Sequence, residues 1–409
     1  MKSSDSGPLG AVPPSPDAAA LRSKRPWLAW ALVGAGVPAH LLLALGTELS
    51  PDEAYYLCAA REPGALPPLV DHPPLLPWLL RLTDAVGLVP VELRVRFWAI
   101  LLSALTSAGM VALGRRRGAS NAASAWVAAV STFALLPMTG GFVITPDGPL
   151  LAALVGVLLI LEGPGRWGRT AAAGALLALG ALAKVVAFPL AGALALGDRR
   201  VSWGARLTLG LLPLVALPWV LPSLGFQLRH AFAKGAGPGG SLADSLGAVL
   251  ALVGAQAFLW GPPVLWLGLR RLRAAPLTER ALVGSLSSLV LLSALVRGVP
   301  PEPNWWAPAA LVVVLGAAEG LAGLGPKARV AALATVLLPT LVVAAHALHP
   351  FLPLRPEQDA TARLHGWRSG RGPERAAGVG SYGPAAESCV YLGECEEIRS
   401  HFNEMKAVP

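Results

Sequence analysis

Charged residues are scarce in this chain of 409 residues. Asp, Glu, Lys and Arg make up 14% of it, while 54% of the residues are hydrophobic. A soluble globular domain carries about 25% charged residues. The shortage therefore excludes an ordinary soluble domain and predicts an integral membrane protein.

Cysteine is also rare, with three residues in the chain: Cys58, Cys389 and Cys395. They form no metal-binding motif, and Cys58 has no evident partner. Cys389 and Cys395 are close enough in sequence to pair if their segment lies in an oxidising compartment.

Acidic residues are fewer than basic ones, and the net charge is +9. An excess of Lys and Arg can indicate nucleic-acid binding. In a protein with several spans it is better explained by the enrichment of Lys and Arg in cytoplasmic loops. We therefore expect no nucleic-acid partner.

Long apolar runs separated by short basic loops dominate the rest of the sequence. They predict an all-α polytopic protein with about 11 transmembrane helices, a cytoplasmic N-terminus and an outer C-terminus. The expected spans are 27–45, 93–113, 122–138, 150–161, two short spans within 170–197, then 207–224, 246–268, 281–296, 306–323 and 330–347.

Three regions follow from this pattern. Residues 1–26 are rich in Pro, Ser and Ala and predict a disordered cytoplasmic tail. Residues 27–348 form the transmembrane domain, with a long outer loop at 47–90. Residues 349–409 form a short polar tail on the outer side. Within the loop, residues 73–82 predict a helix that lies in the membrane interface.

The remaining ionisable residues gather on the predicted outer side. Lys184 interrupts an apolar run, and an ionisable residue inside a span is functional by default, although snorkelling to the interface is the alternative. Other polar candidates on this side are Tyr55, Asp71, His72, Asp147, Arg229, His230 and Asn304.

Two adjacent acids open the long outer loop. Ser50-Pro51-Asp52-Glu53 has the form of a capping box, which needs an acid at Glu53 and none at Asp52. Thr145-Pro146-Asp147 repeats the pattern of a cap, a proline and an aspartate. The structural interpretation is strongest for Glu53, and Asp52 is left as the acid without a structural task.

Each other candidate has a plain structural alternative. Asp147 has the position of a helix cap. Arg229 and His230 begin an outer loop, where solvated charges are common. Tyr55 and the tryptophans after Asn304 are also typical of an interfacial aromatic belt.

Six short motifs occur in order along the outer face: Asp52-Glu-Ala-Tyr-Tyr56, Asp71-His-Pro-Pro-Leu75, Thr145-Pro-Asp147, Ala181-Leu-Ala-Lys184, Phe226-Gln-Leu-Arg-His230 and Asn304-Trp-Trp306. In this order they resemble bacterial polyprenyl-phosphate-dependent glycosyltransferases of the GT-C superfamily, which are related to protein O-mannosyltransferases and the lipid A aminoarabinose transferase. The resemblance covers about residues 27–368.

The resemblance implies an enzyme of the bacterial inner membrane with its active site on the periplasmic, extracytoplasmic face. Such an enzyme moves a sugar, with inversion, from a polyprenyl-phosphate donor to a lipid, glycan or protein acceptor. The expected general base is the acid that opens the first outer loop, which is Asp52 here, with Glu53 beside it. Many relatives carry a larger outer domain than this chain's tail.

The chemistry of the residues agrees with this assignment. Transfer from a lipid phosphate requires a base for the acceptor and cations for the leaving phosphate. Lys184, Arg229 and His230 supply positive charge, and Asp147 joins the catalytic acids. A helix N-terminus lowers the pKa of Asp52, whereas a dry closed site raises it. A divalent cation is compatible with the acids but not obligatory, because lysine and arginine can neutralise the phosphate.

Two other functions remain open. A transporter or flippase for lipid-linked or small solutes would place ionisable residues near the midplane and show a repeated half, and the sequence has no internal repeat of that kind. A membrane assembly protein without activity would leave the six ordered motifs without a cause.

Overall fold

The computed structural model describes seven stretches of the chain: 26–64, 71–163, 167–199, 201–232, 241–355, 358–370 and 382–406. All regular structure in these stretches is helical, which confirms the predicted all-α class. The predicted cytoplasmic tail, except for Pro26, lies outside the described residues.

The described residues contain seven helical units that are long and apolar enough to cross a membrane. They are α2 (Trp27–Gly46), α5 (Val91–Arg116), the unit of α11 (Trp203–Leu211), η1 (Leu212–Ala216) and α12 (Leu217–Phe232), then α13 (Leu242–Trp260), α15 (Leu277–Arg297), η2 (Pro303–Trp306) with α16 (Ala307–Ala322), and α17 (Pro326–Leu348).

Shorter helices complete the bundle. Three of them are apolar: α8 (Asp147–Leu161), α9 (Trp167–Ala183) and α10 (Ala187–Gly197). The others are α6 (Asn121–Phe133), α7 (Leu135–Gly140) and α14 (Pro262–Leu272). The multi-span helical architecture is confirmed, and the number of eleven spans stays a prediction.

Helix α16 lies inside the bundle, and eleven of its 16 residues are buried. Its sequence is rich in Ala and Val, so neighbouring helices approach it closely. Gly268 of α14 lies against the backbone of Val313, where a Cβ atom would clash with the Val313 carbonyl. On the outside, large apolar side chains such as Leu250, Trp266 and Leu341 are exposed, as expected for surfaces that face lipid.

The predicted break in the run 170–197 is confirmed. Helix α9 ends at Ala183 and α10 begins at Ala187, so Lys184 lies in the short connection between them. The single span predicted over 246–268 is instead two helices, α13 and α14, and that prediction is wrong. Gly261 adopts a φ of 89°, and Pro262 then begins α14.

Two local predictions also need correction. Helix α8 begins at Asp147 with Pro146 at its cap position and no capping hydrogen bond from a side chain, so Thr145 is not a cap. Arg229 and His230 lie in the last turn of α12 rather than at the start of a loop, because α12 continues to Phe232.

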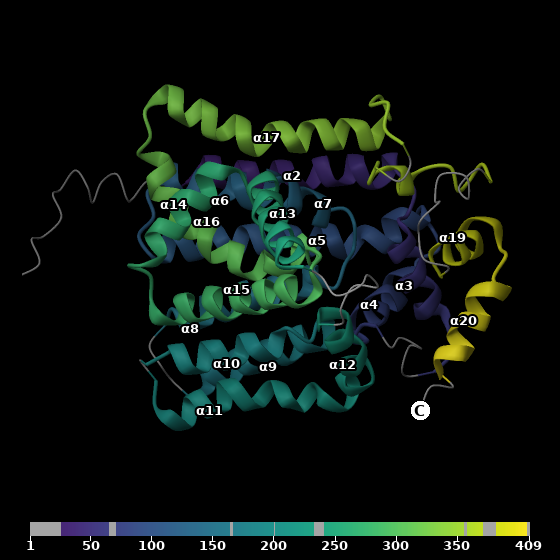
Figure 1. Ribbon diagram of the computed structural model, residues 1–409, viewed down its shortest axis with the longest axis horizontal. Helices are drawn as coiled ribbons and strands as arrows, with labels where there is room; N and C mark the ends of the chain where they lie inside the picture. Colours follow the sequence, from purple (N-terminus) through teal and green to yellow (C-terminus); the bar gives the residue numbers. More distant parts are fainter. Residues whose placement is uncertain are drawn as a thin grey trace, which may run out of the picture.

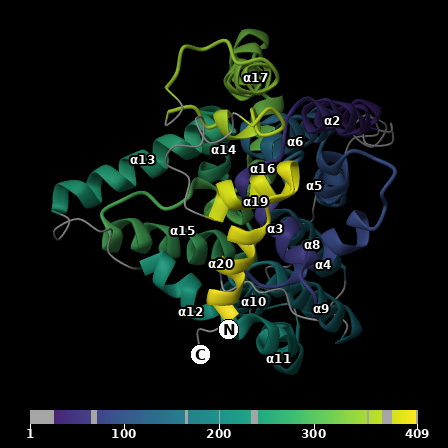
Figure 2. The same cartoon turned by 90° about the vertical axis from the view of Figure 1, so that its right-hand side faces the viewer.

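One end of the bundle carries the polar elements. Helices α3 (Pro51–Arg61), α4 (Leu75–Asp84), α19 (Tyr382–Leu392) and α20 (Glu396–Lys406) gather at the right-hand end in Figure 1. The end-on view in Figure 2 shows α19 and α20 lying across α3. The predicted outer loop and the C-terminal tail therefore build one surface.

Candidate active site

The capping box at the start of α3 is present as predicted. The Ser50 hydroxyl accepts a hydrogen bond from the Glu53 amide at 3.4 Å, and Glu53 Oε2 accepts one from the Ser50 amide at 2.9 Å. Pro51 occupies the first helical position, where its missing N–H costs nothing. The box fixes Asp52 in the first turn of the helix.

Glu53 is fully buried and forms a bidentate ion pair with Arg96 of α5. The two Arg96 nitrogens lie 3.0 and 2.9 Å from the Glu53 oxygens. Glu53 Oε1 also accepts a hydrogen bond from the Ile144 amide at 3.1 Å. Both oxygens are therefore occupied, and this geometry supports the structural interpretation of Glu53.

Arg96 uses its remaining donors on the chain just before α3. It donates to the carbonyl oxygens of Ala44, Thr47 and Glu48 and to the Thr47 hydroxyl, at 2.6 to 3.0 Å. A single buried arginine therefore holds together the end of α2, the start of α3 and α5.

Asp52 faces the other way. Its side chain is exposed to a cavity of about 240 Å³ between α2, α3, α7, α17 and residues 360–364, where Arg363 is also exposed. The Tyr382 hydroxyl of α19 donates a hydrogen bond to Asp52 Oδ1 at 3.1 Å. Asp52 therefore lines this cavity and also contacts a C-terminal helix.

The surroundings of Asp52 raise its pKa above the usual value for an aspartate. Loss of hydration among the packed side chains is the main cause, and the Glu302 and Glu53 carboxylates add to it. The Tyr382 hydrogen bond and Arg363 oppose the rise. The net direction strengthens Asp52 as a base, in agreement with the effect predicted for a dry site.

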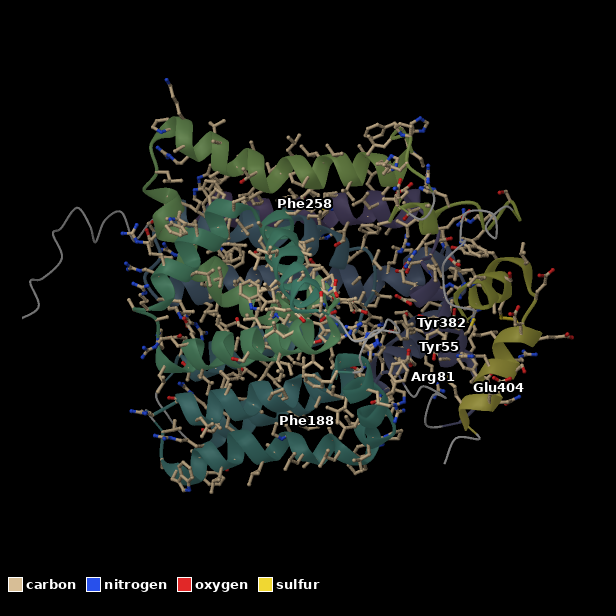
Figure 3. The ribbon with its side chains drawn as sticks, in the orientation of Figure 1. Tyr55, Arg81, Phe188, Phe258, Tyr382 and Glu404 are labelled. Carbon is tan, nitrogen blue, oxygen red and sulfur yellow. A yellow bond between two sulfur atoms is a disulfide. The ribbon has the colours of Figure 1, made fainter. Side chains whose placement is uncertain are left out.

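Tyr55, Asp71 and His72 form a second group beside Asp52. The labelled side chains of Tyr55 and Tyr382 lie next to each other in Figure 3. Their ring centroids are 4.7 Å apart, and the Tyr55 hydroxyl donates to Asp71 Oδ1 at 3.3 Å. Gln227 of α12 donates to the Asp71 carbonyl and lies 3.3 Å from His72 Nδ1. Desolvation raises the pKa of Asp71 to about 6 and lowers that of His72 to about 3.

A third group joins three predicted residues from distant parts of the chain. Lys184 Nζ lies 2.8 Å from Asp147 Oδ1, and the Asn304 amide nitrogen donates to Asp147 Oδ2 at 2.7 Å. Lys184 and Asp147 are 8% and 7% exposed. Lys184 therefore does not reach outward to an interface, as snorkelling would require. Instead it forms a nearly buried ion pair.

A second cavity, of about 380 Å³, begins at this group. Asp147, Asn304 and Thr145 line its polar end. Apolar residues of α7, α8, α13 and α16 dominate the rest, together with hydroxyl-bearing side chains of α5 and α6. Thr139 and Val143 line both this cavity and the one that contains Asp52. The two spaces are therefore adjacent, with Asp52 in one and the Asp147–Lys184 pair beside the other.

Arg229 and His230 are less closely associated with these groups. Arg229 is exposed at the end of α12. His230 Nε2 lies 3.5 Å from the exposed Glu302 carboxylate, and its ring lies 5.8 Å from that of Trp305. Their place at the edge agrees with the alternative that they are solvated charges.

Four residues were missed from the sequence. Arg96 stands within a predicted span, where a charge is itself a signal. Gln227 lies inside a quoted motif, but its contact with Asp71 depends on the fold. Tyr382 and Arg363 come from the polar tail, which carries no periodic pattern that would place them beside Asp52. Where the chain is described, no three His, Cys, Asp or Glu residues are grouped to hold a metal ion.

Comparisons with known proteins give a family match and a fold. Residues 71–226 match the family of dolichyl-phosphate-mannose-protein mannosyltransferases. No curated protein sequence matches this chain.

Two crystal structures of ArnT from Cupriavidus metallidurans share the fold at 17% sequence identity. The apo form gives a TM-score of 0.56 over 92% of this chain and 77% of ArnT. The form bound to undecaprenyl phosphate gives 0.55 over 91% and 74%. The resemblance to polyprenyl-phosphate-dependent glycosyltransferases of the GT-C superfamily is thus confirmed, by the family match over residues 71–226 and by the fold over nearly the whole chain.

Proposed function

We propose that this protein is a membrane glycosyltransferase that moves a sugar from a polyprenyl-phosphate carrier to an envelope lipid, glycan or protein. The reaction takes place on the extracytoplasmic face of the bacterial inner membrane. The observation that carries the proposal is the position of Asp52, whose exposed carboxylate lies in a cavity adjacent to an apolar cavity. The fold and the family match support the same class of reaction.

The apolar cavity suits the carrier lipid, and its polar end suits the phosphate and the sugar. We assign two cations to the leaving phosphate: Lys184, whose partner Asp147 lines this polar end, and Arg363, which lines the adjacent cavity with Asp52. Lys184 Nζ has three N–H donors, and Asp147 needs one of them. Asn304 and Asp147 then orient the sugar hydroxyls. With two cations available the proposal needs no metal ion, and chelation with EDTA should leave transfer unchanged.

Asp52 accepts the proton from the acceptor hydroxyl or amine as that group attacks the anomeric carbon. The new bond forms on one face of the sugar, while the carbon–oxygen bond to the phosphate breaks on the other, which inverts the configuration. The electron pair leaves with the phosphate oxygen, and polyprenyl phosphate is released. Asp52 then passes its proton to water.

The test is transfer by the purified protein in lipid nanodiscs. Undecaprenyl phosphate carrying labelled mannose or aminoarabinose is supplied with an extract of envelope acceptors. We expect labelled acceptor and free undecaprenyl phosphate in equal amounts. Movement of the labelled donor across a vesicle membrane without cleavage would overturn the proposal in favour of a flippase.

Cation variants sharpen this test through binding of labelled undecaprenyl phosphate. Arg363→Met and Lys184→Met should each weaken binding about tenfold, which corresponds to loss of one charge-assisted contact of about 1.4 kcal/mol. Lys327→Met is the matched control. Lys327 is exposed in the first turn of α17, at the opposite end of that helix from the Asp52 cavity. Equal loss in the control would argue against a phosphate site here.

A further inference from the structure

The C-terminal helices contribute one residue directly to the Asp52 site. Tyr382, the first residue of α19, donates its hydroxyl to Asp52 Oδ1 at 3.1 Å. Asp52 and Tyr382 are 330 residues apart in the sequence, and the contact exists only because α19 lies across α3.

Helix α19 is seated on α3 through small residues and specific hydrogen bonds. Ala385 and Ala386 are buried against α3, and the Cys58 thiol donates to the Ala386 carbonyl at 3.6 Å. Near its other end, the Tyr391 hydroxyl accepts from the Leu49 amide at 2.6 Å and donates to Glu92 at 2.8 Å. The contacts of Ala385 and Ala386 hold the end of α19 that carries Tyr382, and those of Tyr391 hold its other end.

Helix α20 packs against the ring of Tyr382. The His401 ring stacks on the Tyr382 ring at 6.0 Å, and the Phe402 ring lies 5.6 Å from that of Tyr55. The disulfide between Cys389 and Cys395 closes the turn that joins the two helices. The aromatic contacts restrict the ring of Tyr382, so its hydroxyl has few positions other than the one at Asp52.

We propose that Tyr382 is a positioning residue for Asp52 and that the α19–α20 hairpin is a wall of the active site. The inference rests on the proposed role of Asp52 as a base. The hydrogen bond at Oδ1 restricts the carboxylate of Asp52, which lines the cavity, and leaves Oδ2 as the oxygen that would take the acceptor's proton. Tyr382 does not touch the reacting atoms.

The Tyr382 contact also tunes the charge of Asp52. A donor to the carboxylate favours its ionised form, and the other charges that act on Asp52 are those of Glu302, Arg363 and Glu53. Desolvation and the acidic neighbours raise the pKa of Asp52, and removing the Tyr382 hydroxyl takes away a contact that lowers it. The carboxylate should then hold its proton to a higher pH.

The test measures the protonation of Asp52 without using catalysis. Dicyclohexylcarbodiimide labels protonated carboxyl groups, and mass spectrometry of the Asp52 peptide across pH 4 to 9 gives the midpoint of labelling. Tyr382→Phe should raise this midpoint by about one pH unit, through loss of a hydrogen bond to a charged group. The acid limb of the transfer rate against pH should shift by the same amount.

Tyr391→Phe is the matched control, because it removes a hydroxyl from the same helix at a contact with Leu49 and Glu92 instead. It leaves the packing of Ala385 and Ala386 on α3 and the aromatic contacts of Tyr382 in place, so the Asp52 midpoint should stay unchanged. An unchanged midpoint in Tyr382→Phe, or an equal shift in both variants, would overturn the inference. A shift confined to Tyr382→Phe in a protein that transfers no sugar would support the contact and reject the proposed function.

Discussion

The two faces of helix α3 carry adjacent acids with opposite environments. Glu53 is completely buried, and both of its oxygens are bonded to Arg96 and to backbone amides. Asp52 is exposed to a cavity and has one hydrogen bond from Tyr382. Two adjacent positions of one helix therefore carry an acid that stabilises the fold and an acid that is available for the reaction.

This difference shows that residue type alone does not decide the role of a carboxylate. The capping box uses the side chain of Glu53 as an acceptor, and the fold then adds a buried cation that pairs with it. Asp52 is not needed for capping, so its unoccupied oxygen can serve a substrate. The predictions that follow alter one side of this contrast at a time.

The largest effect is expected from Arg96→Met. It leaves the Glu53 charge buried without its partner, and breaking such a pair costs about 3 to 5 kcal/mol of unfolding free energy. Thermal unfolding in detergent should show a large loss. Arg94→Met is the control, since Arg94 pairs with the partly exposed Asp84 and should cost about 1 kcal/mol or less. Equal losses would contradict the special role of the buried pair.

A third acid, Glu387, sharpens the comparison because it is buried without a cation. It is 0% exposed on α19, and neither of its oxygens has a hydrogen-bond partner among the described residues. Desolvation and the nearby Glu48, Glu53 and Asp52 raise its pKa to about 10. The folded protein therefore keeps a proton that the unfolded chain releases above its usual pKa near 4.5.

Stability should then fall as pH rises from about 4.5 towards 10, by about 1.4 kcal/mol per pH unit for this group. Glu387→Gln removes this dependence. The variant should exceed the wild type by about 1 kcal/mol or less at pH 5 and by about 3 kcal/mol at pH 7, measured by unfolding across pH. Glu404→Gln, at an exposed position on α20, is the control and should change nothing. A constant difference at every pH would contradict the neutral state of Glu387.

The smallest effect on stability is expected from removing the disulfide of the helices that pack on the Asp52 face of α3. Cys389→Ser with Cys395→Ser opens a short loop, which should cost about 2 kcal/mol of local stability in α19 and α20. Hydrogen exchange should rise in these helices, and the labelling midpoint of Asp52 should move towards that of Tyr382→Phe. Faster exchange around Glu53 and Arg96 instead would show that the two faces of α3 are not independent.

Much of the site was predictable because short motifs mark it. Asp52 and Glu53 were distinguished by the requirements of a capping box, and Lys184 by its position in an apolar run. The structure brings Lys184 together with Asp147 and Asn304, as their shared outer position predicted. Local patterns carry this information because each depends on a few adjacent residues.

The remaining features depend on contacts between distant segments. No periodicity connects Arg96 to Glu53 or Tyr382 to Asp52, and these pairs form when α5 and α19 pack on α3. The break at Gly261 is different, because the sequence Gly261-Pro262-Pro263 signals it and the single span predicted over 246–268 followed the hydropathy of the run instead. The pairing of Cys389 with Cys395, left open in the sequence, is present in the structure.

The most direct test compares Asp52→Asn with Glu53→Gln in one preparation. Asp52→Asn should lower sugar transfer at least 100-fold, through loss of the general base, and leave the unfolding temperature unchanged. Glu53→Gln should lower the unfolding temperature strongly, because Arg96 loses its buried partner. Transfer near the wild-type rate in folded Asp52→Asn would contradict the account.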